Sequence, residues 1–190
     1  NIREFFPGFI DQISGVLDLD FIINSYDDDY KIEVIGNTEN LTIISNFLGE
    51  PSDFSEGKIR LLVNPYNKNY SGFFDLKTSN VDIEVNTVFS NSRLLSLKIN
   101  KFLTPIQDFK MDLDLEKFIA KLSGNKLSIQ KIDFKEESFI SDISNLDFNV
   151  DLEKIILGKN KFLKPLITFK KENYEFSDLN IELNGEKDYH

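Results

Sequence analysis

The chain of 190 residues has no cysteine and no tryptophan, and its one histidine is the last residue, His190. Without cysteine there is no disulfide, no thiolate zinc site and no cysteine nucleophile, whatever the redox compartment. A single histidine also argues against a histidine metal site and against a Ser-His-Asp triad. We therefore expect neither enzymatic activity nor a cofactor.

Positive charge and long apolar runs are scarce as well. The chain has 22 Lys and Arg against 32 Asp and Glu, a net charge of −10. Nucleic-acid binding needs clustered basic residues, so no nucleic-acid partner is expected, and docking on anionic lipid headgroups is disfavoured too. No basic leader and no run of about 18 apolar residues is present. The start at Asn1, without Met, suggests a fragment whose membrane anchor, if any, lies outside it.

What is abundant is apolar residues that alternate with polar ones. Hydrophobic residues make up 41% of the chain, with 18 Phe, which excludes a disordered composition. Period-two alternation is typical of strands with one apolar face, and one-sided strands favour an antiparallel sheet. The clearest examples are GVLDLDFII (15–23), DFKMDLDLE (108–116), LDFNVDLE (146–153) and DLNIEL (178–183). The pattern predicts a mainly β fold of about ten strands: an antiparallel, curved, open, groove-like sheet.

Three stretches depart from this alternation. Apolar residues at helical spacing occur in residues 40–50, 114–124 and 151–158, and these stretches end at or near Gly49, Gly124 and Gly158. Glycine is a common helix terminator, so the spacing predicts two or three short helices of one or two turns. A bulged strand is the alternative for each.

A decamer is also repeated. NKFLTPIQDF (100–109) and NKFLKPLITF (160–169) share six of ten positions, and D-L-E-K occurs at residues 114 and 151. We interpret the decamer as a proline-containing connector that leads into the next strand of a repeating sheet, with compositional coincidence as the alternative. The chain is treated as one unit, residues 1–190, with a possible sub-boundary near residue 90, where FSNSR interrupts the pattern.

Residues 32–81 resemble a known family. They follow the order strand, Leu-rich segment ending in Leu48-Gly49, spacer, alternating strand from Gly57, turn, and a second strand containing Gly72. This order resembles the AsmA-like superfamily of Gram-negative envelope proteins, especially its long YhdP-like members. Asn-Leu replaces the more usual Asp-Ala/Leu opening, and the spacer lacks a second glycine before Gly57.

The resemblance implies a repeating β-groove with an apolar concave face and no catalytic residues. Such proteins are anchored in the inner membrane, extend through the periplasm, and are thought to conduct phospholipid acyl chains toward the outer membrane. The expected partners are therefore acyl chains and flanking repeats of the same chain. An apolar trough without a directional polar code suits an acyl chain. The alternative function is a β-sandwich-like protein-binding or adhesive module with a sealed core.

The candidate groove residues are the apolar members of four alternating strands. They are Leu17, Leu19, Phe21, Ile59, Leu61, Val63, Phe109, Met111, Leu113, Leu146, Phe148 and Val150. The same residues would also serve as an ordinary sealed core, and the sequence does not separate the two. Acidic groups are weaker candidates: residues 27–29 for calcium, and Asp112 with Asp114 or Glu136 with Glu137 for a glycosidase pair. Solvated turns and polar strand faces explain them better.

Overall fold

The computed structural model describes residues 12–26, 29–45, 49–53, 56–66, 69–90, 93–129 and 144–185. These residues form twelve strands and no helix. The strands are β1 (Gln12–Tyr26), β2 (Asp29–Ser45), β3 (Gly49–Asp53), β4 (Gly57–Tyr66), β5 (Asn69–Lys77), β6 (Asp82–Ser90), β7 (Arg93–Leu103), β8 (Asp108–Asp114), β9 (Ile119–Ile129), β10 (Leu146–Leu157), β11 (Asn160–Glu172) and β12 (Glu175–Gly185).

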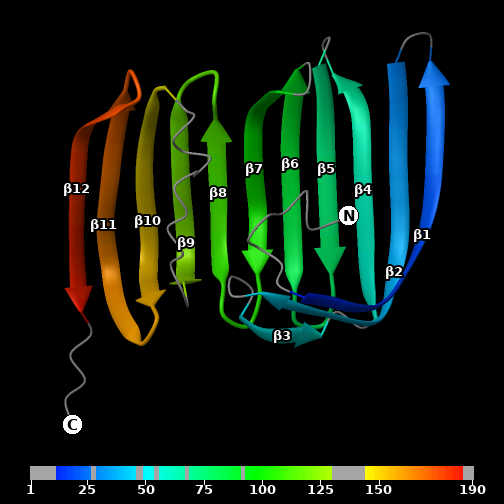
Figure 1. The fold of residues 1–190 in the computed structure, drawn as a ribbon, viewed down its shortest axis with the longest axis horizontal. Helices are drawn as coiled ribbons and strands as arrows, with labels where there is room; N and C mark the ends of the chain where they lie inside the picture. The colour runs from blue at the N-terminus through cyan, green and yellow to red at the C-terminus, as the bar shows by residue number, and fades with distance from the viewer. Residues whose placement is uncertain are drawn as a thin grey trace.

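All twelve strands belong to one open sheet (Figure 1). Eleven follow one another across it in the order β1-β2-β4-β5-β6-β7-β8-β9-β10-β11-β12, and β3 pairs with β2 off this path. The sheet does not close, since β1 and β12 lie at opposite edges. The prediction of an open β-sheet is confirmed, and the prediction that it is antiparallel holds for every strand pair except one. The possible boundary near residue 90 falls between β6 and β7, which pair from Ser90–Arg93 down to Asp82–Leu103.

One neighbouring pair is parallel. β9 and β10 run in the same direction, with Ile119 beside Asp147 and Ile129 beside Leu157. The chain therefore re-enters the sheet at the end where β9 begins. This parallel seam, which the sequence pattern does not predict, divides the path into one antiparallel series from β1 to β9 and a second from β10 to β12.

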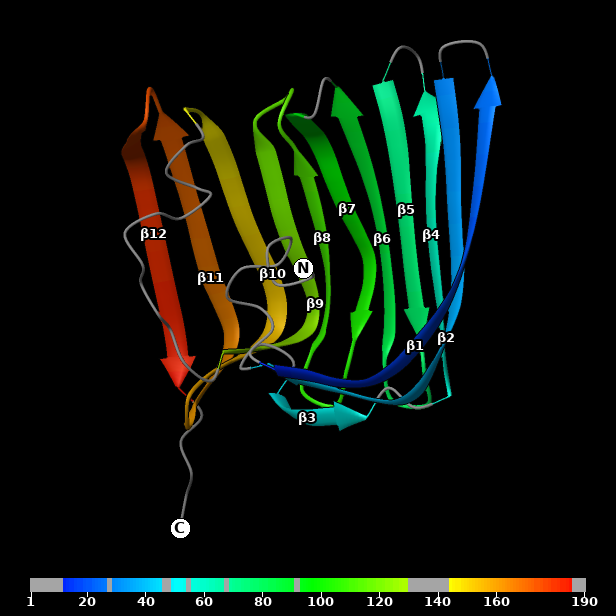
Figure 2. The same ribbon diagram turned by 45° about the vertical axis from the view of Figure 1, so that its right-hand side comes forward.

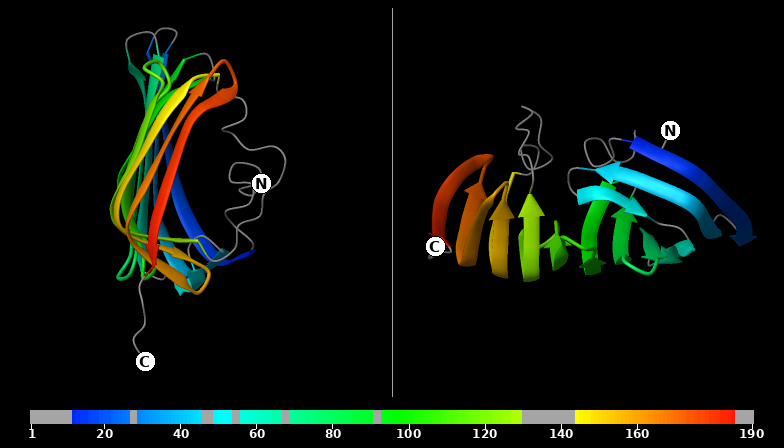
Figure 3. Two further views of the ribbon diagram at one scale, coloured as in Figure 1. Left: turned by 90° about the vertical axis from the view of Figure 1, so that its left-hand side faces the viewer. Right: turned by 90° about the horizontal axis from the view of Figure 1, so that it is seen from below.

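The sheet is curved, and its apolar side chains lie on the concave face. The N-terminal end of β1 and the C-terminal end of β2 bend across the lower end of the sheet on its concave side (Figures 1 and 2). Leu41, in this part of β2, packs against Leu76 and Ile83 of β5 and β6. Leu76, Ile83 and the residues in register with them therefore face the concave side, which Figure 3 shows edge-on.

The bend in β1 and β2 has a local cause. The β1–β2 register shifts between Ser14 and Val16, where Gly15 has φ +119° and Asn40, opposite it, has φ 49°. A Cβ on Gly15 would lie 2.6 Å from the Cα of Leu41, so only glycine fits both the backbone angle and the space. The irregularity is a bulge, which kinks a strand pair and increases its twist.

A second line of bulges crosses β7 to β11. The registers shift between Ile99 and Phe102 on β7, beside Gly124 on β9, and between Leu163 and Leu166 on β11. Gly124 has φ +141°, and a Cβ there would lie 2.7 Å from the Cα of Phe109. Each bulge resets the alternation, so apolar residues on both sides of it reach the concave face. In Figure 3 the lower strand ends curve toward that face.

The expected short helices are wrong for the described residues. Residues 41–45 belong to β2, 119–124 to β9 and 151–157 to β10, while residues 115–118 form a turn. Apolar residues three and four apart arise there because a bulge or turn shifts the strand phase. Leu152 and Ile155, three residues apart on β10, belong to one core cluster. Residues 46–48, including Leu48 of the expected helix, lie outside the described part of the chain.

The repeated decamer also has two different structures. Residues 100–109 end β7, turn, and begin β8, as a connector should, whereas residues 160–169 lie wholly within β11. The connector interpretation is therefore wrong for the second copy, where Lys164, with φ 44°, and Pro165 occupy the bulge. Proline is tolerated there because a bulge leaves a backbone position out of the ladder.

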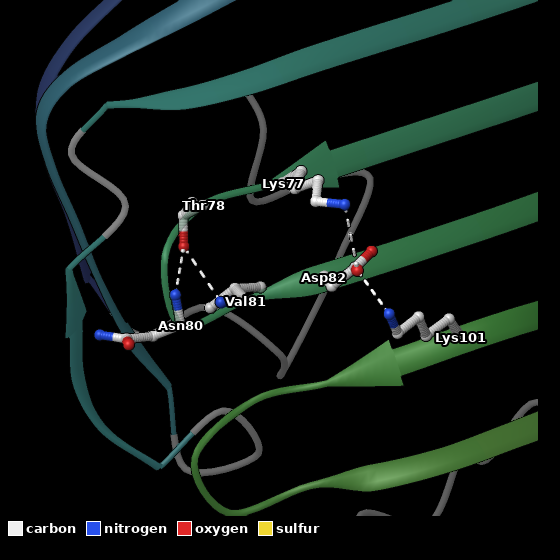
Figure 4. A network of polar contacts seen from close by, with 6 residues as sticks. All are labelled: Lys77, Thr78, Asn80, Val81, Asp82 and Lys101. Atoms are coloured by element: carbon white, nitrogen blue, oxygen red, sulfur yellow. Dashed lines mark hydrogen bonds and ion pairs between the residues drawn. The ribbon is translucent and has the colours of Figure 1, made fainter.

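Two turns at the lower end share one construction. Thr78 Oγ1 accepts hydrogen bonds from the amides of Asn80 (3.2 Å) and Val81 (3.0 Å), as Figure 4 shows. Thr104 Oγ1 likewise accepts from the amides of Ile106 (3.3 Å) and Gln107 (3.0 Å). The threonine hydroxyl thus replaces a missing backbone acceptor at the β5–β6 and β7–β8 connections.

Candidate apolar binding face

The candidate site is the concave face itself, and all twelve candidate groove residues project from it. The registers join β1 to β2, β2 to β4, and so on across the sheet, and residues paired in register share a face. The three candidates on each of β1, β4, β8 and β10 are therefore brought to one side, although the strands are far apart in the sequence.

One cross-strand row shows how continuous this face is. The row contains one residue from each of the eleven strands on the path, each in register with the next. Its members are Phe21, Val34, Leu61, Phe74, Val85, Ile99, Met111, Leu122, Val150, Ile167 and Ile181. Every member of this central row is apolar. Ten spacings of about 4.8 Å make the row roughly 48 Å long along the curved sheet.

The adjacent row on the convex face is mixed. It aligns Ile22, Glu33, Leu62, Phe73, Asn86, Lys98, Asp112, Lys121, Asn149, Thr168 and Asn180. Apolar residues there are interrupted by polar and charged ones. The contrast between the two rows defines the concave face as the apolar side.

The concave face is buried in its middle and open at its flanks. Phe109, Leu113, Leu146 and Val150, four of the candidates, are at most 5% exposed and belong to the core clusters of β8 to β10. Phe102 and Phe109 stack there with ring centroids 4.8 Å apart. At the β1 edge, by contrast, Phe21 is 65% exposed and Leu61 is 37% exposed.

Exposed apolar side chains gather in two patches on this face. The β1 patch consists of Phe21, Ile23, Tyr30 and Leu61 on β1, β2 and β4. The β12 patch consists of Phe176, Leu179, Ile181 and Leu183, and β12 is exposed along its whole length. Between the two patches, the concave face also carries a charged residue, Lys171 on β11. Its side chain is buried, and its ammonium nitrogen lies 5.8 Å from the centre of the Tyr174 ring. Sequence alternation indicates the apolar side of each strand but not which members stay exposed.

The convex face is held by ion pairs between neighbouring strands. Arg60 on β4 pairs with Glu33 on β2 at 2.9 Å, and Lys121 on β9 pairs with Asp151 on β10 at 3.5 Å. Asp82 on β6 lies between Lys77 of β5 at 3.7 Å and Lys101 of β7 at 2.5 Å (Figure 4). Opposite charges on adjacent strands stabilise the sheet modestly and fix its register.

The hydrogen bond from Lys101, with the charges of Lys101 and Lys77, lowers the pKa of Asp82 below its ordinary value. A lowered carboxyl pKa adds stability above the unfolded-state pKa and loses it as the pH falls through the folded-state pKa. Asp82→Asn should therefore lower the free energy of unfolding at about pH 7, by less than about 1 kcal/mol because both lysine partners are exposed to solvent. The difference from wild type should shrink below about pH 4.

Urea unfolding of both proteins at the two pH values checks this. Asp178→Asn serves as the control, because no ion pair to a described residue involves Asp178. A deficit for Asp82→Asn that stays the same at both pH values would contradict the assignment.

Of the weaker acidic candidates that the structure describes, Asp114 has a structural role. Asp114 caps the β8–β9 turn: its Oδ1 accepts from the amides of Glu116 (3.1 Å) and Lys117 (3.0 Å), and its Oδ2 accepts from the Lys117 ammonium (2.7 Å). These bonds lower its pKa, the opposite of what a general acid needs. The part of the chain that the structure describes contains no cluster of three His, Cys, Asp or Glu able to hold a metal, and no helix that could cross a membrane. Asp27, Asp28, Glu136 and Glu137 lie outside it.

The chain was compared with family models, curated proteins and solved structures, and none of them matches.

Proposed function

We propose that the concave face shields lipid acyl chains, as part of a non-catalytic envelope protein that transfers phospholipid between two membranes. The observation that carries the proposal is the central row, an unbroken line of eleven apolar side chains whose two ends are exposed. Exposed apolar patches of this kind on a protein surface mark binding sites for apolar partners. The resemblance of residues 32–81 to the AsmA-like superfamily supports the same function.

The physical fit is to a flexible hydrocarbon chain. Burial of apolar area is favourable by about 25 cal/mol per Å² and imposes no direction, so a smooth apolar surface accepts acyl chains in many positions. The phenylalanine-rich face has few side-chain donors or acceptors to select a particular headgroup. In this proposal the full-length protein lies in the periplasm with an inner-membrane anchor, and flanking repeats of the same chain extend the sheet.

Lipid binding is best tested at the β1 patch. The variant Phe21→Asp/Ile23→Asp places charge on the concave face, and Ile22→Asp/Ile35→Asp places the same charge on the convex face of β1 and β2. All four residues are exposed, so both variants should keep the fold, which circular dichroism can verify. We expect phospholipid to co-purify with the wild type and the convex variant, and to be reduced several-fold in the concave variant.

Native mass spectrometry with lipid extraction of protein purified from a Gram-negative periplasm gives the readout. Equal lipid loss from both variants, or a wild-type protein without lipid, would overturn the proposal. A lipid-free wild type would favour the alternative, a protein-binding module. The observation on that side is the burial of Phe109, Leu113, Leu146 and Val150, which are already packed as a core.

A further inference from the structure

The two edge strands of the sheet have the same charge pattern. On the convex side β1 presents Asp18 and Asp20, and β12 presents Asp178 and Glu182. All four residues are exposed. On the concave side both strands present apolar residues, among them Leu19 and Phe21 on β1 and Leu179 and Ile181 on β12.

Inside the sheet, three acidic residues on the convex face make ion pairs with basic residues on neighbouring strands. Glu33 pairs with Arg60, Asp82 with Lys77 and Lys101, and Asp151 with Lys121. At the β12 edge this arrangement is incomplete. Lys170, the residue in register with Asp178, makes its ion pair with Glu172 at 2.7 Å, and no ion pair to a described residue involves Asp178 or Glu182.

We propose that the β12 edge is a pairing site for a polypeptide strand that alternates apolar residues with lysine or arginine. The apolar residues of such a strand would extend the concave face beyond the β12 patch, and its basic residues would face Asp178 and Glu182. Edge strands have unpaired backbone groups, and main-chain pairing with alternate side-chain selection is an established mode of peptide recognition. This inference does not depend on lipid binding.

The same charges disfavour a second copy of the chain as the occupant. β1 and β12 run in opposite directions, so a copy added beside β12 would place its β1 antiparallel to it (Figure 1). Asp18 and Asp20 would then face the acidic side of β12. Like charges on neighbouring strands are destabilising, so the wild-type chain should remain monomeric.

The chain can supply its own basic strand for a test. The variant Asp18→Lys/Asp20→Lys turns β1 into an alternating apolar and basic strand, which should pair with β12 of the next copy. We expect a mass above the 22.0 kDa monomer in light scattering after gel filtration, and weakening at high salt because the charges are exposed. Adding Asp178→Lys/Glu182→Lys should restore the monomer, since both edges are then basic.

Two controls separate edge pairing from a change of net charge. Adding Asp147→Lys/Glu153→Lys, on the interior strand β10, to the β1 variant makes the same charge change and should leave the oligomer intact. The reciprocal variant Asp178→Lys/Glu182→Lys alone should also oligomerise. It tests the same edge pairing if the β1 variant does not fold. Monomeric β1 and β12 variants, an oligomer that ignores the second pair of substitutions, or an oligomeric wild type would each overturn the proposal.

Discussion

Replacing Gln107 with alanine is expected to lower the free energy of unfolding by about 3 kcal/mol. The side chain is fully buried. Its amide pairs with the backbone of Ser128 on β9, as a residue of a neighbouring strand would. Its Nε2 donates to the carbonyl oxygen of Ser128 at 2.6 Å, and its Oε1 accepts from the amide of Ser128 at 2.8 Å. Alanine leaves both backbone groups buried without these bonds, and each unsatisfied buried group costs about 1–3 kcal/mol.

Urea unfolding measures this effect, with Asn125→Ala as the matched control. Asn125 also donates a side-chain amide hydrogen bond, to Asp108 at 2.6 Å, but in an exposed position where water replaces the lost partner. Its substitution should cost less than about 1 kcal/mol. A second variant, Gln107→Glu, keeps the size but, when ionised, has no donor for the Ser128 carbonyl. If Gln107→Ala and Asn125→Ala both lower the free energy of unfolding by a similar small amount, the Gln107 amide is not important for stability.

Phe109→Ala should destabilise the protein by about 3–5 kcal/mol, whereas Phe21→Ala should have little effect. Both are phenylalanines on the same concave face. Phe109 is 4% exposed, stacks on Phe102, and packs against the β9 and β10 members of its cluster, so its removal leaves a cavity. Phe21 is largely solvated already.

Thermal or urea unfolding of the two alanine variants distinguishes a closed middle from open flanks. Met111, a neighbour on the same strand and face as Phe109, is half-buried, so Met111→Ala should fall between the two. Equal costs for Phe109→Ala and Phe21→Ala would mean that the two positions do not differ in packing, and the distinction between core and patch would be wrong.

Side-chain alternation was enough to predict the sheet and its apolar side. In β8, Phe109, Met111 and Leu113 alternate with Lys110 and Asp112, and the registers place the first three on the concave face. Since the side-chain period of a strand is two, no tertiary information is needed to group them. Exposure is different, because it depends on which other segments lie over each residue.

The helices were mispredicted because a bulge mimics helical spacing. Val150, Leu152 and Ile155 share one cluster although a strict two-residue period would place Ile155 on the other face. Asn40 and Gly124 mark similar phase changes on β2 and β9. A sequence window that contains one bulge therefore shows apolar residues two and three apart, which overlaps with the pattern of a short helix.

The parallel seam could not have been predicted from alternation either. Phe148 and Val150 point to the concave face whether β10 runs with β9 or against it, so the side-chain pattern is the same for both arrangements. Parallel neighbours need a crossover connection, and alternation within the strands carries no information about it.

The seam has a consequence for how the protein folds. β10, β11 and β12 are joined by tight turns at Gly158–Lys159 and Asn173–Tyr174, so their contacts are local and form early. Contacts across the seam join residues 28 positions apart, as Ile119 and Asp147 show, and they require a larger loop to close first. We therefore expect β9–β10 pairing to form after the β10–β11 and β11–β12 hairpins, together with the core clusters that β8, β9 and β10 share. Opening of the seam would uncover the edge of β9 and would also break these shared clusters.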